Sequence, residues 1–171
     1  APAAITADAR GAYFVTADSD GRAVLRATTD GTNFRELAAV VGGSPVSGAA
    51  VVDGFVYWAA VVANQTDVYR SSTDLATGAA EIFATVDGAV SELTASAAGI
   101  FVVVPGGSAG GNARGAVLRL PLAGGTGATL LPSEKNPRGL QLLAEGMFAV
   151  YTDDGPVRWT TSRSLLPARA F

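Results

Sequence analysis

The sequence predicts an all-β protein built from four similar units, and three observations support that fold class. An apolar or aromatic pair followed by an arginine recurs four times along the 171 residues. Short apolar stretches alternate with Asp-Gly and Gly-rich segments, a pattern typical of β-hairpins. No window shows the i, i+3, i+4, i+7 spacing of apolar residues that an amphipathic helix requires. We therefore expect essentially no helix.

Two sets of residues give the repeat length independently. The recurrent arginines are 44, 49 and 39 residues apart, and the aromatic residues before them are 44, 43 and 47 residues apart. The four-residue stretch AVLR even occurs twice, at Ala23–Arg26 and at Ala116–Arg119. The recurrent residues are Arg26, Arg70, Arg119 and Arg158, with Phe14, Trp58, Phe101 and Phe148 before them.

Each unit has room for four short strands separated by turns. Four strands in a unit of about 40–50 residues are typical of a β-propeller blade. The predicted strands are Ile5–Asp8, Gly11–Ala17, Arg22–Thr28, Phe34–Val40, Ser47–Val52, Phe55–Val61, Asp67–Ser72, Glu81–Val86, Leu93–Ala97, Ile100–Val104, Ala116–Leu120, Ala128–Leu131, Gln141–Ala144, Met147–Thr152, Val157–Thr161 and Ser164–Leu166.

These units predict a single β-propeller domain over residues 1–171, with repeats at approximately 5–45, 46–90, 91–139 and 140–171. Four blades either close as a four-bladed ring or form half of a larger ring that another chain completes. The alternative all-β fold is a sandwich, which is disfavoured because a sandwich does not require a four-strand unit to recur.

Composition excludes several classes of function. Hydrophobic residues make up 49% and charged residues 16%, which is too apolar for a disordered chain. The absence of cysteine excludes a disulfide framework and a thiolate nucleophile, and the absence of histidine excludes a Ser-His-Asp triad. A net charge of −3 without a basic patch argues against a nucleic-acid partner. No apolar run approaches the ~20 residues of a membrane-spanning helix.

The repeated pattern resembles that of secreted bacterial β-propeller repeat proteins of the YWTD and NHL types. An acidic or small turn, an aromatic pair, a loop, Val-x-Arg and a polar turn follow one another in DGFVYWAAVVANQTDVYRSSTD, Asp53–Asp74. The same order is seen less fully at Ala9–Gly31. In the first of these stretches Ala59-Ala60 stands where the family has Thr-Asp. The resemblance implies a propeller fold and a binding function, but it does not imply a particular reaction.

The recurrent arginines are interpreted as structural. An arginine inside a blade lays its stem on apolar neighbours, and we expect it to bond carbonyls of the next blade. Binding of an anion in a central channel is the alternative.

Two acidic turns, Asp18 with Asp20 and Asp153 with Asp154, are interpreted in the same structural way, because Asp bonds its own backbone in turns. Calcium is the alternative there, although the turns lack the long ligand series of an EF-hand. No other cofactor is expected.

Three loop residues are the candidate contacts to a binding partner. Asn64 begins an Asn-Gln-Thr triplet, the acceptor pattern for N-glycosylation. Asn112 and Arg114 belong to the Gly-rich stretch Gly106–Gly115, which lacks the Gly-Lys-Ser/Thr ending of a phosphate-binding loop. The aromatic pairs are interpreted as blade packing, with a sugar-stacking platform as the alternative.

The resulting functional hypothesis is a non-catalytic binding or scaffold module. It engages a protein partner, or a second copy that completes the ring, through blade edges and loops. A lectin-like glycan-binding propeller is one alternative, and a propeller lyase or lactonase, disfavoured by the absence of histidine, is another. No catalytic residue is assigned. We expect a secreted, periplasmic or cell-surface location, which the small residues of Ala1–Ala4 fit as a processed N-terminus.

Overall fold

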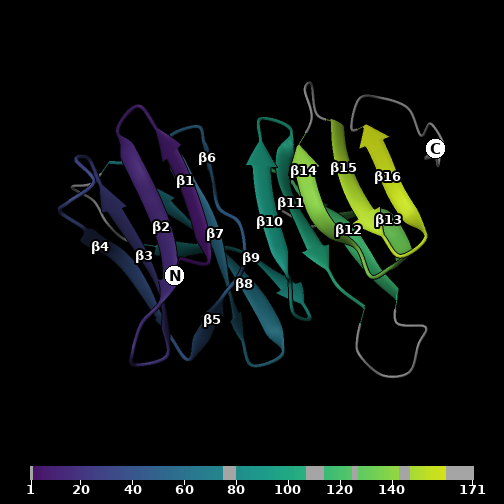
Figure 1. The fold of residues 1–171 in the computed structure, drawn as a ribbon, viewed down its shortest axis with the longest axis horizontal. Coiled ribbons are helices and arrows are strands. Elements are labelled where there is room, and N and C mark those ends of the chain that lie inside the picture. Colours follow the sequence, from purple (N-terminus) through teal and green to yellow (C-terminus); the bar gives the residue numbers. More distant parts are fainter. Residues whose placement is uncertain (1, 75–79, 107–113, 125–126, 143–146, 161–171) are drawn as a thin grey trace. The chain divides into compact units, whose positions relative to one another are not determined.

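A computed structural model of the chain describes residues 2–74, 80–106, 114–124, 127–142 and 147–160. These residues form sixteen β-strands in four antiparallel sheets and contain no helix (Figure 1). The all-β prediction is therefore confirmed for the described part of the chain. The chain divides into two compact units, residues 1–89 and residues 90–171, and each unit holds two of the sheets.

The first sheet is an antiparallel meander of four strands, as the sequence predicts. Asp18 makes its second turn: Oδ1 accepts hydrogen bonds from the backbone N–H of Asp20 at 3.0 Å and of Arg22 at 2.9 Å. The role of Asp18 in forming a turn is therefore confirmed. The strands, in spatial order, are β1 (Ala4–Asp8), β2 (Gly11–Ala17), β3 (Arg22–Thr28) and β4 (Arg35–Val41).

The second sheet departs from the prediction at its first strand. In place of one strand over Ser47–Val52, two short strands pair with different parts of the same neighbour. Pro45 has no N–H to donate and Gly48 has a φ of 93°, so the ladder is interrupted between the two strands. The strands are β5 (Gly43–Pro45), β6 (Ala50–Val52), β7 (Phe55–Val62), β8 (Gln65–Ser72) and β9 (Ala80–Asp87).

The second unit holds a four-stranded sheet and a sheet with three described strands. The predicted strands of this unit are confirmed, with ends that differ by a few residues, except for Ser164–Leu166, which lies outside the described residues. The third sheet consists of β10 (Glu92–Ser96), β11 (Gly99–Val104), β12 (Arg114–Leu120) and β13 (Ala128–Lys135). The fourth consists of β14 (Arg138–Leu142), β15 (Met147–Thr152) and β16 (Gly155–Thr160).

In each unit the two sheets bury a core between them. In the first unit Leu25 of β3 and Trp58 of β7 are fully buried in the same core. In the second unit Phe101 of β11 and Phe148 of β15 are buried together, with ring centroids 5.6 Å apart. Further members are Tyr13, Val15, Ala23, Leu37, Val56 and Tyr69 in the first core, and Val103, Val117, Leu131 and Val150 in the second.

The two AVLR stretches turn opposite faces toward these cores. Leu25 of the first copy packs between the two sheets of its unit. In the second copy Val117 does so, and Leu118 lies on the other face of β12. The stretches thus differ by one residue in register, and a shift of one residue exchanges the two faces of a strand.

The same exchange corrects the alignment of aromatic residues. Tyr13 packs into the core between the sheets, as Phe101 does in the second unit, whereas Phe14 lies on the opposite face of β2. Phe14 was expected to correspond to Phe101, because both are aromatic residues a similar distance before an arginine. Adjacent residues of a strand point to opposite faces, so spacing in sequence does not decide which one is buried.

Candidate functional site

One face of the first sheet points away from the core that its other face forms with the second sheet. We call it the aromatic face and define it by Ile5, Phe14, Arg26, Phe34, Glu36 and Val41. Ile5 lies opposite Phe14 in the ladder, Phe14 opposite Arg26, and Arg26 opposite Glu36. Residues directly opposite in a ladder share a face, so these side chains form one row across the four strands. Phe34 joins the row through an edge-to-face ring contact with Phe14, with centroids 5.5 Å apart.

The aromatic face concentrates exposed apolar surface. Five large apolar side chains of the described residues are exposed, and three of them lie here. Ile5 is 59% exposed, Phe34 56% and Val41 80%. Single apolar residues are common on protein surfaces, but several on one face indicate a site of association.

The face is hollowed at two places that share Phe14. The larger hollow has a volume of about 670 Å³ and lies between the aromatic pair and the two charged side chains. The smaller, of about 350 Å³, extends along the turns that join β1 to β2 and β3 to β4. Hollows of roughly 300–1,000 Å³ are large enough to receive a ligand or the side chains of a partner. The larger one is lined by Pro2, Phe14, Thr16, Arg26, Phe34 and Glu36.

The charges on this face are incompletely paired. Arg22 is bound to Asp18, with Nη2 2.6 Å from Oδ2, and backbone and guanidinium hydrogen bonds from Arg22 hold the pKa of Asp18 below its ordinary value. Glu36 has only a 3.8 Å contact with Arg22, and its side chain is 43% exposed. Within the described residues, Arg26 makes no hydrogen bond and no ion pair. The face therefore presents one open cation next to one weakly paired anion.

A matching row in the second sheet shows the same residue types with their charges neutralised. Tyr57 lies opposite Arg70, and Arg70 lies opposite Glu81. The Arg70 guanidinium donates to Glu81 and lies 5.0 Å from the ring centroid of Phe55 and 5.6 Å from that of Phe83. The carboxylate and aromatic partners of Arg70 all come from its own sheet. Arg26 has no bound carboxylate in its own sheet.

The structural interpretation of the arginines is confirmed for Arg70 and for Arg119. Arg119 donates from Nε to the carbonyl oxygen of Ala98 at 2.7 Å. Bonds to the next blade were expected, and that detail is wrong: both arginines bond groups of their own sheet. The reason is geometric, since the neighbouring strand and the adjoining turn lie within reach of a side chain that rises from the middle of a sheet.

The loop candidates remain predictions. Asn64 lies in the turn between β7 and β8, where its carbonyl oxygen accepts a hydrogen bond from the N–H of Gly88 at 3.1 Å. Arg114 begins β12, and Asn112 lies outside the described residues. Asn64 and Arg114 belong to different units, and neither lies on the aromatic face. The sequence analysis missed that face because a β-bulge at Leu37 interrupts the alternation of β4: Leu37 and Val41 are four residues apart, yet Leu37 is buried and Val41 is 80% exposed.

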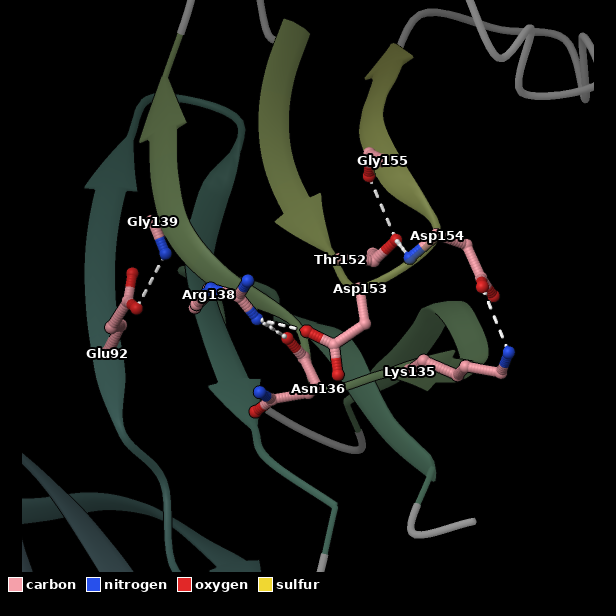
Figure 2. A network of polar contacts seen from close by, with 9 residues as sticks. All are labelled: Glu92, Lys135, Asn136, Arg138, Gly139, Thr152, Asp153, Asp154 and Gly155. Carbon is pink, nitrogen blue, oxygen red and sulfur yellow. Dashed lines mark hydrogen bonds and ion pairs between the residues drawn. The ribbon is translucent and has the colours of Figure 1, made fainter. Parts of the chain in front are cut away.

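The acidic turns of the second unit belong to a network of exposed polar contacts (Figure 2). Lys135 lies 2.9 Å from Asp154, and Arg138 lies 2.6 Å from Asp153 and lowers the pKa of that carboxyl group. These contacts tie the β13–β14 link to the β15–β16 turn. No three His, Cys, Asp or Glu side chains gather as metal ligands in the described part of the chain.

Glu92 makes the strongest contacts of the network. It accepts a hydrogen bond from the backbone N–H of Gly139 at 2.7 Å (Figure 2). It also accepts one from the backbone N–H of Leu140 at 2.6 Å, and the two bonds join β10 to β14. Because its contacts are to backbone groups of the neighbouring sheet, Glu92 holds the two sheets of this unit together.

Comparison with solved structures identifies the fold as similar to that of β-propeller proteins. One such structure is a nidogen–laminin complex, with a TM-score of 0.63, 17% identity, and coverage of 88% of this chain and 55% of that chain. Another is a candidate gluconolactonase, with a TM-score of 0.62, 15% identity, and coverage of 94% and 59%. The chain thus spans little more than half the length of these structures. No protein-family model and no curated protein sequence matches it.

The class of protein shown by these findings is an all-β protein of antiparallel sheets with propeller-type structural neighbours. Among the described residues there is no helix long and apolar enough to span a bilayer.

Proposed function

We propose that the chain is a non-catalytic binding or scaffold module of the β-propeller type, and that it engages a protein partner through its aromatic face. The observation that carries this proposal is the grouping of exposed Ile5, Phe34 and Val41 around the open charge of Arg26. Aromatic residues and arginine are enriched at protein–protein interfaces relative to the rest of the protein surface.

The packing inside each unit supports a protein partner over a small ligand. Both cores form by one sheet covering the face of another, so the sheet faces of this protein are suited to that contact. The nidogen–laminin structure gives independent support, since that neighbour is itself a protein complex.

The proposed architecture is four blades, one for each sheet. Coverage of only 55% and 59% of the neighbouring propellers supports half of a larger ring over a closed four-bladed ring. We further propose a secreted, periplasmic or cell-surface location. Asn64, Asn112 and Arg114 are retained as proposed loop contacts to the partner.

Cross-linking in an extract of the source cells, followed by mass spectrometry, tests the proposed function. Phe34→Asp places a charge on the aromatic face beside Phe14, and Ile82→Asp places one at a 60% exposed position on the edge strand β9. We expect Phe34→Asp to lose cross-linked partners that the wild type and Ile82→Asp retain. An identical set of partners for all three proteins, or turnover of lactone substrates by the purified protein, would contradict the proposal.

A further inference from the structure

We infer that the partner that covers the aromatic face is a second copy of this chain, packed face to face. The inference rests on the proposed function, because it names the partner for the same surface. Its basis is that the face carries both members of an ion pair, Arg26 and Glu36, on adjacent strands and directly opposite in the ladder. They make no ion pair with each other within the copy.

The matching row of the second sheet shows how an arginine between aromatic residues is neutralised by a carboxylate. There Arg70 lies over two aromatic rings and is bound to a carboxylate, so its charge is neutralised within its own sheet. Arg26 has the aromatic neighbour Phe14 opposite it but no carboxylate bound. Covering the face without supplying an anion would leave a buried unpaired charge, which is costly. The occupant must therefore bring a carboxylate to Arg26.

A second copy brings that carboxylate without any further requirement. A two-fold axis that runs parallel to the strands reverses the order of the row in the other copy. Glu36 of one copy then comes to Arg26 of the other, and the symmetry makes this contact twice. Arg22 competes only weakly for Glu36, because its guanidinium is bound to Asp18 at 2.6 Å and lies 3.8 Å from Glu36.

The apolar residues fit the same arrangement. Phe34 projects from the face with 56% of its surface exposed, beside a hollow of about 670 Å³. In a two-fold contact each copy offers one projecting ring and one hollow. Two such faces thus supply each other with both an apolar anchor and its receptacle.

The size of the face sets the strength to be expected. Glu36 meets Arg26 of the other copy only if the two-fold axis lies between β3 and β4, so these two strands of each copy overlap. Two seven-residue strands, at about 3.3 Å per residue and about 4.8 Å apart, cover roughly 23 by 10 Å, and the two faces together bury ~460 Å². This area is well below the ~1,600 Å² of a standard stable interface, so we expect a weak dimer with a dissociation constant on the order of 100 μM.

Sedimentation equilibrium of the purified full chain between about 2 and 200 μM tests the inference. The wild type is expected to form dimers at the upper end of this range. Arg26→Glu and Glu36→Arg should each weaken dimerisation at least tenfold, because each places like charges opposite each other. An equimolar mixture of the two variants should restore dimerisation to within about threefold of the wild type, since both contacts in the mixed dimer then join opposite charges.

Two further variants are measured for comparison. Phe34→Asp should abolish dimers, and Lys135→Glu, a charge reversal in the second unit, should leave dimerisation unchanged. Each variant is first compared with the wild type by thermal unfolding. If Arg26→Glu does not fold, Arg26→Gln, which removes the charge without reversing it, replaces it and should weaken dimers about threefold or more.

Three results would overturn the inference: a monomer at 200 μM, dimers that no substitution on the aromatic face weakens, or a mixture of the two charge variants that stays monomeric. A monomer whose cross-linked partners are lost on Phe34→Asp would instead show a different protein on this face. In that case the proposed function stands and the second copy is excluded.

Discussion

Arginine side chains at matching points of the first two sheets have different surroundings. Arg70 donates to Glu81 and lies over the rings of Phe55 and Phe83, whereas Arg26 lies opposite Phe14 and Glu36 but has no bound anion. Residue type and cross-strand register are nearly the same in the two rows. The availability of Arg26 for a partner therefore follows from the side chains around it and not from its place in the repeat.

Burial decides how much an aromatic residue contributes to stability. Trp58 is fully buried, stacks on Tyr69 at 4.8 Å and donates from Nε1 to Ser71 Oγ at 3.3 Å. We expect Trp58→Ala to lower the free energy of unfolding by about 3–5 kcal/mol, because it leaves a large cavity and unpairs Ser71. Phe34→Ala, at a 56% exposed position of the same unit, should lower it by less than about 1 kcal/mol. Urea unfolding followed by circular dichroism measures both, and equal losses would contradict the assigned burial.

Tyrosine ionisation predicts a loss of stability at alkaline pH. Burial, helped by the nearby charge of Asp67, raises the pKa of Tyr69 from 10.0 to about 12. The unfolded chain therefore loses this proton at lower pH than the folded chain does. The contribution of Tyr69 is fully present below pH 10 and is lost as the pH rises toward 12.

The measurement is urea unfolding at a series of pH values from 9 to 12. We expect Tyr69→Phe to flatten the decline in the free energy of unfolding over this range. Tyr151→Phe, at a 53% exposed position, is the control and should leave the slope as in the wild type. A decline with the same slope in Tyr69→Phe would show that this hydroxyl group is not the cause.

At the scale of elements, strands are joined by two kinds of contact. Within each sheet the hairpin ladders follow the chain order, and Asp-containing turns close them. Between the two sheets of the second unit, backbone groups of β14 are bound by Glu92, and exposed ion pairs such as Lys135–Asp154 join the turns (Figure 2). These contacts differ in energy, because a charge-assisted bond to backbone is worth more than an exposed ion pair.

Glu92→Ala tests that difference. Two backbone N–H groups lose a carboxylate acceptor, so we expect a loss of about 1.5–3 kcal/mol in the free energy of unfolding. Hydrogen exchange should accelerate at the amides of Gly139 and Leu140. Lys135→Ala, which removes one exposed ion pair, should cost less than about 0.5 kcal/mol. Unchanged exchange at both amides would contradict the role of Glu92 between the sheets.

At the scale of the whole molecule, each unit has a core of its own residues. Trp58 belongs to a core formed by residues between 4 and 80, and Phe101 to one formed by residues between 98 and 150. Cooperative regions of a protein open with different free energies when their packing differs. The two units are therefore expected to respond separately to substitutions in their cores.

Native-state hydrogen exchange on the full chain measures this response. Phe101→Ala should lower protection at Val103, Val117 and Val150 and leave Val15 and Leu25 close to their wild-type protection. Trp58→Ala should have the converse effect. Loss of protection in both units with either substitution would mean that the chain unfolds as one cooperative body.

By itself, the sequence determined the all-β class and most strand positions in the described part of the chain. Apolar alternation and Asp-Gly or Gly-rich turns are local properties, so nearly every predicted strand was found within a few residues of its expected place. The split first strand of the second sheet is an exception, since Pro45 and Gly48 interrupt a stretch whose apolar pattern is continuous.

Only the tertiary structure decided which side of each strand is buried. The two AVLR stretches bury Leu25 in one unit and Val117 in the other, and Tyr13 enters the core while Phe14 lies on the aromatic face. Alternation divides a strand into two faces but does not say which of them another sheet covers. That choice depends on residues far away in the chain, and it is this choice that leaves Arg26 open to a partner.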